Sequence, residues 1–84
     1  TPELLATAQE RLAAWRDAVM RDAGPDGTDV VARLRTHLAD DLDTPGALAV
    51  VDAWAAEARA GRADDPTAPR LVRDAVDALL GVAL

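Results

Sequence analysis

The sequence predicts an all-α fold, a single antiparallel four-helix bundle, and three observations lead to that prediction. Half of the 84 residues are hydrophobic, and most of these are Ala, Leu and Val, with two Trp and neither Phe nor Tyr. Ala and Leu are strong helix formers, whereas the aromatic residues that favour strands are nearly absent. Apolar residues recur at intervals of three and four in four stretches, and chain breakers lie between those stretches.

The first predicted helix covers about residues 3–22. Its apolar positions form one face of the helix, and charged residues occupy the other face. The apolar positions are Leu5, Ala8, Leu12, Trp15 and Val19. We expect Trp15 to belong to the core, because a stacking platform for a base or a sugar needs further aromatic residues or a basic surrounding.

The segment of residues 23–29 contains two Gly and one Pro and interrupts the helix. It does not match a phosphate-binding loop, because no strand precedes it and neither the Walker pattern nor the dinucleotide pattern is present. Thr28 or Asp29 is expected to cap a second helix, which covers about residues 28–42.

His37 lies in this second helix beside an apolar stripe. It is the only His in a chain without Cys, so the sequence offers it no evident metal partners. We expect a surface or boundary histidine. The alternative is a general base, which needs a nucleophile and an orienting carboxylate, and the sequence indicates neither.

The turn between the second and third helices lies within residues 38–54. An acidic run ends the apolar pattern of the second helix and consists of Asp40, Asp41 and Asp43. Thr44 is expected to cap the third helix, about residues 45–60, with Pro45 at its first position. The aspartates are favoured by the positive end of the new helix dipole. A calcium loop is disfavoured, because the alternating ligands, the Gly and the distal Glu of an EF-hand are missing.

The third helix is apolar over a wide arc, so we place it at the centre of the bundle, in contact with more than one neighbour. Gly61 is expected to end it, and Arg59 and Arg62 suit the negative end of its dipole better than a phosphate-contact role. Pro69 marks the first turn of a fourth amphipathic helix, about residues 67–82. Helices joined by such short breaks are expected to have antiparallel neighbours.

Composition limits the classes of function. The net charge of −6 provides no general basic surface for a phosphate backbone, so binding to nucleic acid is disfavoured. No apolar run reaches the length of a membrane span and no signal-peptide pattern opens the chain, so we expect a cytoplasmic protein without a membrane partner. The absence of Cys excludes disulfides and cysteine-based metal sites within the chain. We expect one domain, residues 1–84, with a thin core that normally rests on a larger body.

The segment ADDLDTPGALAVVDAWA resembles the helical domain, often called the DALR domain, that follows the catalytic body of cysteinyl-tRNA synthetases. In that family an acidic pair, an apolar residue, Asn or Asp, and then Thr-Pro lead into an apolar helix. The matching positions here are Asp40, Asp41, Leu42, Asp43, Thr44, Pro45, Ala47 and Leu48. Three longer stretches, ATAQERLAAWRDAV, DVVARLRTHLADDLDTP and APRLVRDAVDALLGVAL, are more similar to the C-terminus of a related family, the actinobacterial mycothiol-pathway cysteine ligases. This resemblance covers nearly the whole chain.

The resemblance implies that the chain is the C-terminal part of a longer enzyme, which uses ATP to join cysteine to glucosaminyl-inositol through a cysteinyl-adenylate. In both families the chemistry belongs to a nucleotide-binding catalytic domain with HIGH-like and KMSKS-like motifs and a zinc ion that holds the cysteine thiol. None of these motifs occurs here, so we expect no catalytic, cofactor-binding or metal-binding residue in this chain. ATP and zinc are expected in the catalytic domain of the parent enzyme. That domain is the expected partner, and the docking face is expected around Val50 and Trp54 or on the last helix.

Two alternatives remain open at the level of sequence. The first is a tRNA-contacting domain of a cysteinyl-tRNA synthetase, which shares the resemblance but disagrees with the acidic charge and the absence of Lys. The second is a free-standing helical interaction module that has no parent enzyme.

Overall fold

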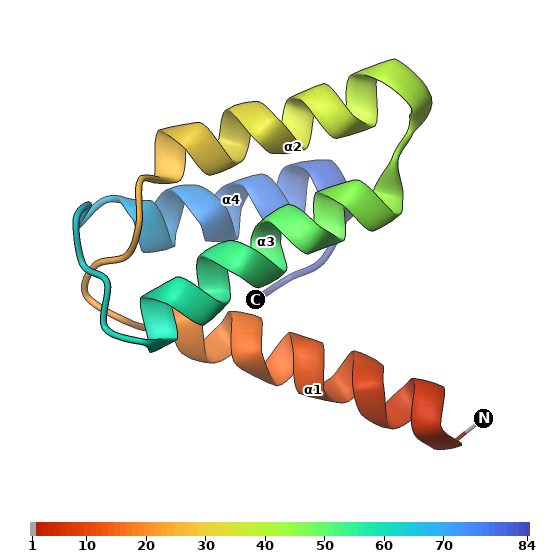
Figure 1. The fold of residues 1–84 in the computed structure, drawn as a ribbon, viewed down its shortest axis with the longest axis horizontal. Helices are drawn as coiled ribbons and strands as arrows, with labels where there is room; N and C mark the ends of the chain where they lie inside the picture. Colours follow the sequence, from red (N-terminus) through yellow and green to blue (C-terminus); the bar gives the residue numbers. More distant parts are fainter. Residues whose placement is uncertain (1) are drawn as a thin grey trace.

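The computed structural model describes residues 2–84, apart from the side chains of residues 40 and 41, and contains four helices (Figure 1). They are α1 (Pro2–Val19), α2 (Gly27–Asp41), α3 (Thr44–Arg59) and α4 (Ala68–Leu80). Within the described residues no strand forms, although an isolated antiparallel bridge pairs Gly24 with Asp65. The predicted all-α fold with four helices is confirmed.

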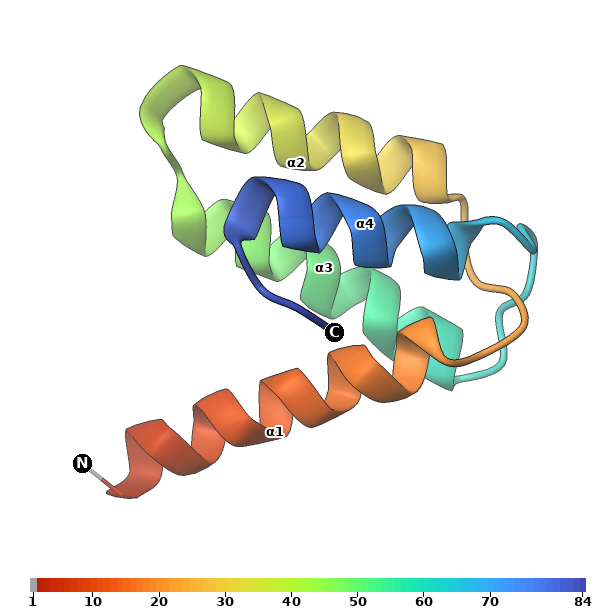
Figure 2. The same cartoon turned by 180° about the vertical axis from the view of Figure 1, so that it is seen from behind.

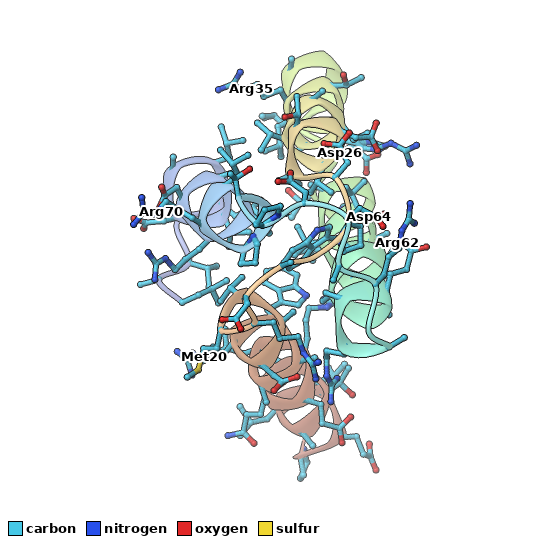
Figure 3. All side chains as sticks on the ribbon, turned by 90° about the vertical axis from the view of Figure 1, so that its left-hand side faces the viewer. Met20, Asp26, Arg35, Arg62, Asp64 and Arg70 are labelled. Atoms are coloured by element: carbon cyan, nitrogen blue, oxygen red, sulfur yellow. The ribbon has the colours of Figure 1, made fainter. Side chains whose placement is uncertain are left out.

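The four helices pack in a ring. Helix α1 contacts α3 and α4, and α2 contacts the same two helices. Figure 3 views the helices roughly end-on. It shows α1 and α2 on opposite sides of the ring, with α3 and α4 between them. Successive helices run in opposite directions, whereas the packed pairs α1 with α3 and α2 with α4 run roughly the same way (Figures 1 and 2). Antiparallel neighbours are therefore not confirmed for every packed pair.

Helix α3 contacts two neighbours, α1 and α2, as its wide apolar arc predicts. Each of the four helices contacts two neighbours in the ring, but α3 and α4 bury five residues each, whereas α1 buries two. The two helices therefore share the centre of the fold, rather than α3 alone occupying it.

Helices α2 and α3 each begin one residue before the predicted start, because side chains other than the predicted ones provide the caps. Asp26, not Thr28 or Asp29, caps α2, and its carboxylate accepts a hydrogen bond from the Thr28 N–H at 3.0 Å. Asp43, not Thr44, caps α3. Asp26 lies two positions before Thr28, and Asp43 lies one position before Thr44. From there each carboxylate can reach a free N–H of the first turn.

The helices also end earlier than their apolar patterns suggest. Helix α1 stops at Val19 rather than at residue 22, and α4 stops at Leu80 rather than at residue 82. Gly81 follows α4 with a φ of +71°, a left-handed conformation that terminates a helix at low cost in glycine. Gly61 follows α3 with a φ of +104°, so its predicted role in ending that helix is confirmed.

The core is built from Trp, Leu, Val and Ala side chains of all four helices. Its largest fully buried side chains are Leu34, Val51, Val72 and Val76. Buried alanines from α1, α3 and α4 fill contacts between the helices, and small side chains let helix backbones approach closely. Trp15 is only 3% exposed, so its predicted place in the core is confirmed.

The first half of α1 projects beyond the ring (Figures 1 and 2). Every residue from 2 to 10 is exposed, whereas Trp15 and Ala18 in the second half are buried. Leu5, which the periodicity places on the apolar face, is 62% exposed. The predicted stripe of α1 is therefore a core face only in its second half.

Replacing Leu34 with Ala is expected to destabilise the chain by about 2–5 kcal/mol, because it removes a completely buried side chain and leaves a cavity. The same change at the exposed Leu5 is the matched control and should cost less than about 1 kcal/mol. Urea unfolding of the two variants measures the difference. Equal losses of stability would contradict the packing described for α2.

Candidate functional site

The turn between α2 and α3 carries the sequence resemblance, and Asp43 is its central residue. Its Oδ1 accepts a hydrogen bond from the Gly46 N–H at 2.9 Å, and its Oδ2 lies 3.0 Å from His37 Nδ1. The Asp43 N–H donates to the His37 carbonyl oxygen at 2.9 Å. One residue thus closes the end of α2 and opens α3.

The environment of Asp43 favours its ionised form. The hydrogen bond from the Gly46 N–H, supported by the His37 ring, lowers the pKa of Asp43 below its ordinary value of 3.8, while partial desolvation opposes the shift. An ionised carboxylate only accepts hydrogen bonds, so His37 Nδ1 carries the proton in this contact.

His37 therefore has the orienting carboxylate that sequence reasoning did not find. The side chain is half-buried, as expected for a boundary histidine. The available signal was an acidic residue shortly after the histidine, but it becomes informative only when the turn is known to bring the two residues together. Among the described side chains, no group of three or more His, Cys, Asp or Glu could hold a metal ion. We interpret the contact between His37 and Asp43 as one that stabilises the turn between α2 and α3.

Leu42 adopts an unusual backbone conformation at this turn. Its φ of +49° lies in the left-handed region, which costs a residue with a β-carbon about 1–2 kcal/mol. The side chain is 78% exposed, so no burial offsets the cost. The hydrogen bonds of Asp43 hold this conformation in place. The predicted placement of Asp40 and Asp41 before the α3 dipole falls on side chains outside the described part of the chain.

A second junction joins the α1–α2 loop to the α3–α4 loop. Gly24 and Asp65 exchange two backbone hydrogen bonds, of 3.1 and 2.8 Å. The Asp65 carboxylate accepts from the Gly27 N–H at 3.1 Å with one oxygen, and from the Thr67 N–H and Oγ1 at 2.9 and 2.7 Å with the other. Asp65 thereby fixes the start of α2 relative to the approach to α4.

These hydrogen bonds also set the charge state of Asp65. The Thr67 hydroxyl makes the largest contribution, followed by the Gly27 N–H, and together they lower the pKa of Asp65 below its ordinary value of 3.8. The carboxylate that fixes the two helix starts is therefore ionised at neutral pH.

Trp54 packs beneath the same junction. Its indole N–H donates to the Pro25 carbonyl oxygen at 2.9 Å in a buried hydrogen bond. Gly24 lies so close to the ring that a β-carbon there would be 2.7 Å from Trp54 Cζ2. A larger residue at position 24 would force the ring or the loop to move, so this glycine is required by close approach rather than by its backbone angles.

The Gly-rich loop leads into α2, whose first two backbone N–H groups are already hydrogen-bonded. The Gly27 N–H is bound by Asp65, and the Thr28 N–H is bound by Asp26. The first backbone donors of α2, which bind phosphate in phosphate-binding loops, are thus occupied by carboxylates of the chain itself. This geometry agrees with the exclusion of a phosphate loop from the sequence.

The two arginines near the end of α3 are also held by carboxylates. Arg59 Nε lies 3.1 Å from an Asp17 oxygen. Arg62 binds Glu57 at 3.0 Å and Asp64 at 2.6 Å, and Asp64 makes the main contribution to raising the pKa of Arg62 above its ordinary value. Figure 3 shows Arg62 and Asp64 together at the surface beside α3. Both guanidinium groups therefore serve ion pairs, which favours the structural interpretation over phosphate contacts.

Helix α1 is fastened to α3 through Asp52. The Trp15 indole N–H donates to Asp52 Oδ1 at 2.8 Å, and Arg11 Nε and Nη2 contact the same carboxylate at 3.1–3.2 Å. This cluster is half-buried, so the carboxylate is bound from two sides and only partly hydrated.

The docking face expected around Val50 and Trp54 is wrong for Trp54, which is 2% exposed and hydrogen-bonded inside the fold. The last helix does present apolar side chains, since Leu71 and Leu79 are 38% and 37% exposed. A further apolar surface lies where α1 meets α3 and the C-terminal segment. We define the α1 face as Leu5, Ala8, Leu12, Leu48 and Val82. All of these residues except Leu5 line a hollow of about 240 Å³. Its full lining is Ala8, Arg11, Leu12, Trp15, Leu48 and Val82.

The polar groups discussed above thus form caps, loop ties and ion pairs around an apolar core, and together these features define a small helical domain. No family model matches the chain. It is 62% identical, over all 84 residues, to proteins of Thermobispora bispora and Streptosporangium roseum, and 58% identical to one of Gordonia bronchialis. All three are named L-cysteine:1D-myo-inositol 2-amino-2-deoxy-alpha-D-glucopyranoside ligase.

Over its full length the chain is therefore homologous to one segment of these cysteine ligases, and the resemblance drawn from the sequence is confirmed. The chain spans about a fifth of the length of these relatives, 20% to 21%. Within the described residues no helix combines the length and the apolar character needed to cross a membrane.

Replacing Trp54 with Phe is expected to cost about 1–3 kcal/mol, because it leaves the buried Pro25 carbonyl oxygen without its donor. Trp15→Phe is the matched control. It also removes an indole N–H, but Asp52 keeps its contacts with Arg11, so the loss should be smaller. Urea unfolding compares the two variants, and an equal or larger loss for Trp15→Phe would contradict the assignment.

Replacing Asp65 with Asn is expected to lower stability at pH 7 and to flatten the acid limb of the stability profile. Because the folded pKa of Asp65 is lowered, its contribution is complete well above the ordinary value of 3.8 and is lost as the pH falls through the folded pKa. Thermal unfolding between pH 7 and pH 2 measures this. Asp64→Asn, which removes one exposed contact with Arg62, is the control and should leave the stability at pH 7 nearly unchanged. An unchanged acid limb in Asp65→Asn would refute the role of Asp65.

Proposed function

We propose that the chain is the C-terminal supporting domain of an ATP-dependent ligase that joins cysteine to glucosaminyl-inositol in mycothiol biosynthesis. The carrying observation is the 62% identity over the whole chain to relatives named for that ligation, of which the chain spans about a fifth. In this proposal the larger part of the enzyme holds the ATP, the zinc ion and the catalytic residues, and the present domain, of the DALR type, packs against that catalytic part.

The geometry of the described residues supports a structural role. Asp43 and Asp65 are engaged in helix caps and loop ties, and Asp52 fastens α1 to α3. The His37–Asp43 pair has the form of an oriented base, but its carboxylate is also committed to the Gly46 N–H at the start of α3. Such a base would have to move the turn in order to act.

The proposal also includes the catalytic domain as partner and the cytoplasm as location, as expected from the sequence. A tRNA-contacting role is less well supported. The net charge of −6 opposes contact with a phosphate backbone, and the two arginines near the end of α3 are already paired with carboxylates.

The test is a ligase assay with ATP, cysteine, zinc and glucosaminyl-inositol on the complete enzyme that contains this chain, beside the purified 84-residue chain. We expect the complete enzyme to form the amide and the isolated chain to show no turnover, because the reacting groups lie elsewhere. The decisive readouts are AMP release and product mass. Turnover by the isolated chain would overturn the placement of the chemistry, and an inactive complete enzyme would overturn the proposed reaction.

A further inference from the structure

We infer that the α1 face is the surface through which this domain docks on the rest of the ligase polypeptide; the inference rests on the proposed function. It commits to one occupant, the catalytic part of the same chain. Four observations lead to it. They are the continuity of an apolar helix stripe, the shape of the hollow beside it, the ion pair of Arg11 and Asp52 at the hollow, and the length of the relatives.

The apolar stripe of α1 is continuous along the helix, but the bundle covers only its second half. Residues seven positions apart lie on the same face of a helix, two turns from one another. Ala8 therefore shares a face with Trp15, and Leu5 shares one with Leu12. Trp15 is buried and Leu12 is half-buried, whereas Ala8 and Leu5 are exposed. The same face that packs on the bundle in one half of α1 is uncovered in the other.

The opposite side of α1 shows which side remains in water. Glu10 is two residues after Ala8, about 200° around the helix, and Glu3 lies on the side of Glu10 because it is seven residues away. The projecting half is thus amphipathic, and Leu5 and Ala8 on its apolar side are exposed. An amphipathic pattern of this kind is typical of a helix with one face buried against a partner.

The stripe leads into a hollow rather than onto a flat surface. Ala8 and Leu12 of α1, Leu48 of α3 and Val82 of the C-terminal segment line it, and Trp15 lies at its side. Figure 2 shows the C-terminal segment passing from α4 toward α1. Residues of α1, α3 and this segment therefore line one hollow. A concave apolar surface can accept side chains from a partner and shield them from water.

The charged side chain at the hollow does not oppose burial. Arg11 is the one charged residue among the described residues that line it, and its guanidinium is bound to the Asp52 carboxylate at 3.1 Å. A partner that covers the hollow therefore buries a neutralised pair and not an isolated cation, which avoids the largest desolvation cost.

The lengths of the relatives indicate the occupant. They are about five times as long as this chain, which spans 20% to 21% of them. In the proposed function the remaining part precedes Pro2, so it continues from the projecting end of α1. Covalent continuity gives that part a high effective concentration at the α1 face, which a second copy of the chain does not have.

The experiment is hydrogen–deuterium exchange on the complete ligase, analysed by mass spectrometry. We expect the amides of residues 4–12 to exchange at least about tenfold more slowly in the wild-type enzyme than in the Leu5→Asp variant, because docking suppresses opening of the projecting helix. Leu5 is 62% exposed within the domain, so this change should leave the bundle folded. Slow exchange in α4 is the internal check of folding.

Leu71→Asp is the matched control, since it places the same charge on an exposed apolar position of α4 outside the α1 face. It should leave the exchange of residues 4–12 unchanged. Fast exchange of these residues in the wild-type enzyme, or equal effects of the two variants, would overturn the inference. Protection that rises with enzyme concentration would also overturn it, because it would identify a second copy as the occupant.

The ligase assay separates this inference from the proposed function. An active enzyme with an unprotected α1 would refute the docking surface and leave the function intact. Protection of α1 in an enzyme that forms no product would support the docking surface and refute the proposed reaction.

Discussion

The ties made by Asp65 are the constraint on which the rest of the arrangement depends. Helices α1 and α2 are not packed neighbours in the ring, and neither are α3 and α4, so the loops that join them must cross the end of the bundle. Asp65 pairs with Gly24 through the backbone and holds the Gly27 N–H with its carboxylate. Because the same carboxylate also binds Thr67, the two crossing loops and two helix starts are set by one residue.

Trp54 connects this polar junction to the hydrophobic core. Its ring fills the space under Gly24, and its N–H satisfies the buried carbonyl of Pro25. A chain of this size buries only a small core, so a large side chain that both packs and hydrogen-bonds has a disproportionate effect on stability. At the other end of the bundle, Asp43 has the corresponding role, because it closes α2 and opens α3 within one tight turn.

These ties hold the second half of α1 against the bundle, whereas its first half projects beyond the ring and residues 2–10 are exposed. The contacts of Trp15 and Arg11 with Asp52 fix the helix where it meets α3. Beyond that point the helix continues as an amphipathic rod. In the proposed function, this apolar surface becomes buried against the remaining part of the enzyme.

The local properties of this chain could be read from its sequence. Helix type, the approximate helix limits and the chain breaks follow from residue spacing and from Gly and Pro, which act within a few residues of themselves. The resemblance to the cysteine ligases could also be recognised, because sequence similarity can be detected without a structure. The choice of Asp26 and Asp43 as caps was missed, since neighbouring Thr and Asp residues compete for that role and only backbone geometry separates them.

Only the tertiary structure decided which residues meet across the fold. The sequence placed Leu5 and Trp15 on one stripe, but the end of the bundle leaves one exposed and buries the other. It placed Trp54 on a broad apolar arc, yet the ring of helices turned that side chain inward. The sequence indicated no carboxylate partner for His37, but the turn brings the Asp43 carboxylate into contact with it. Periodicity specifies the faces of each helix, whereas the crossing of the loops determines which faces are covered.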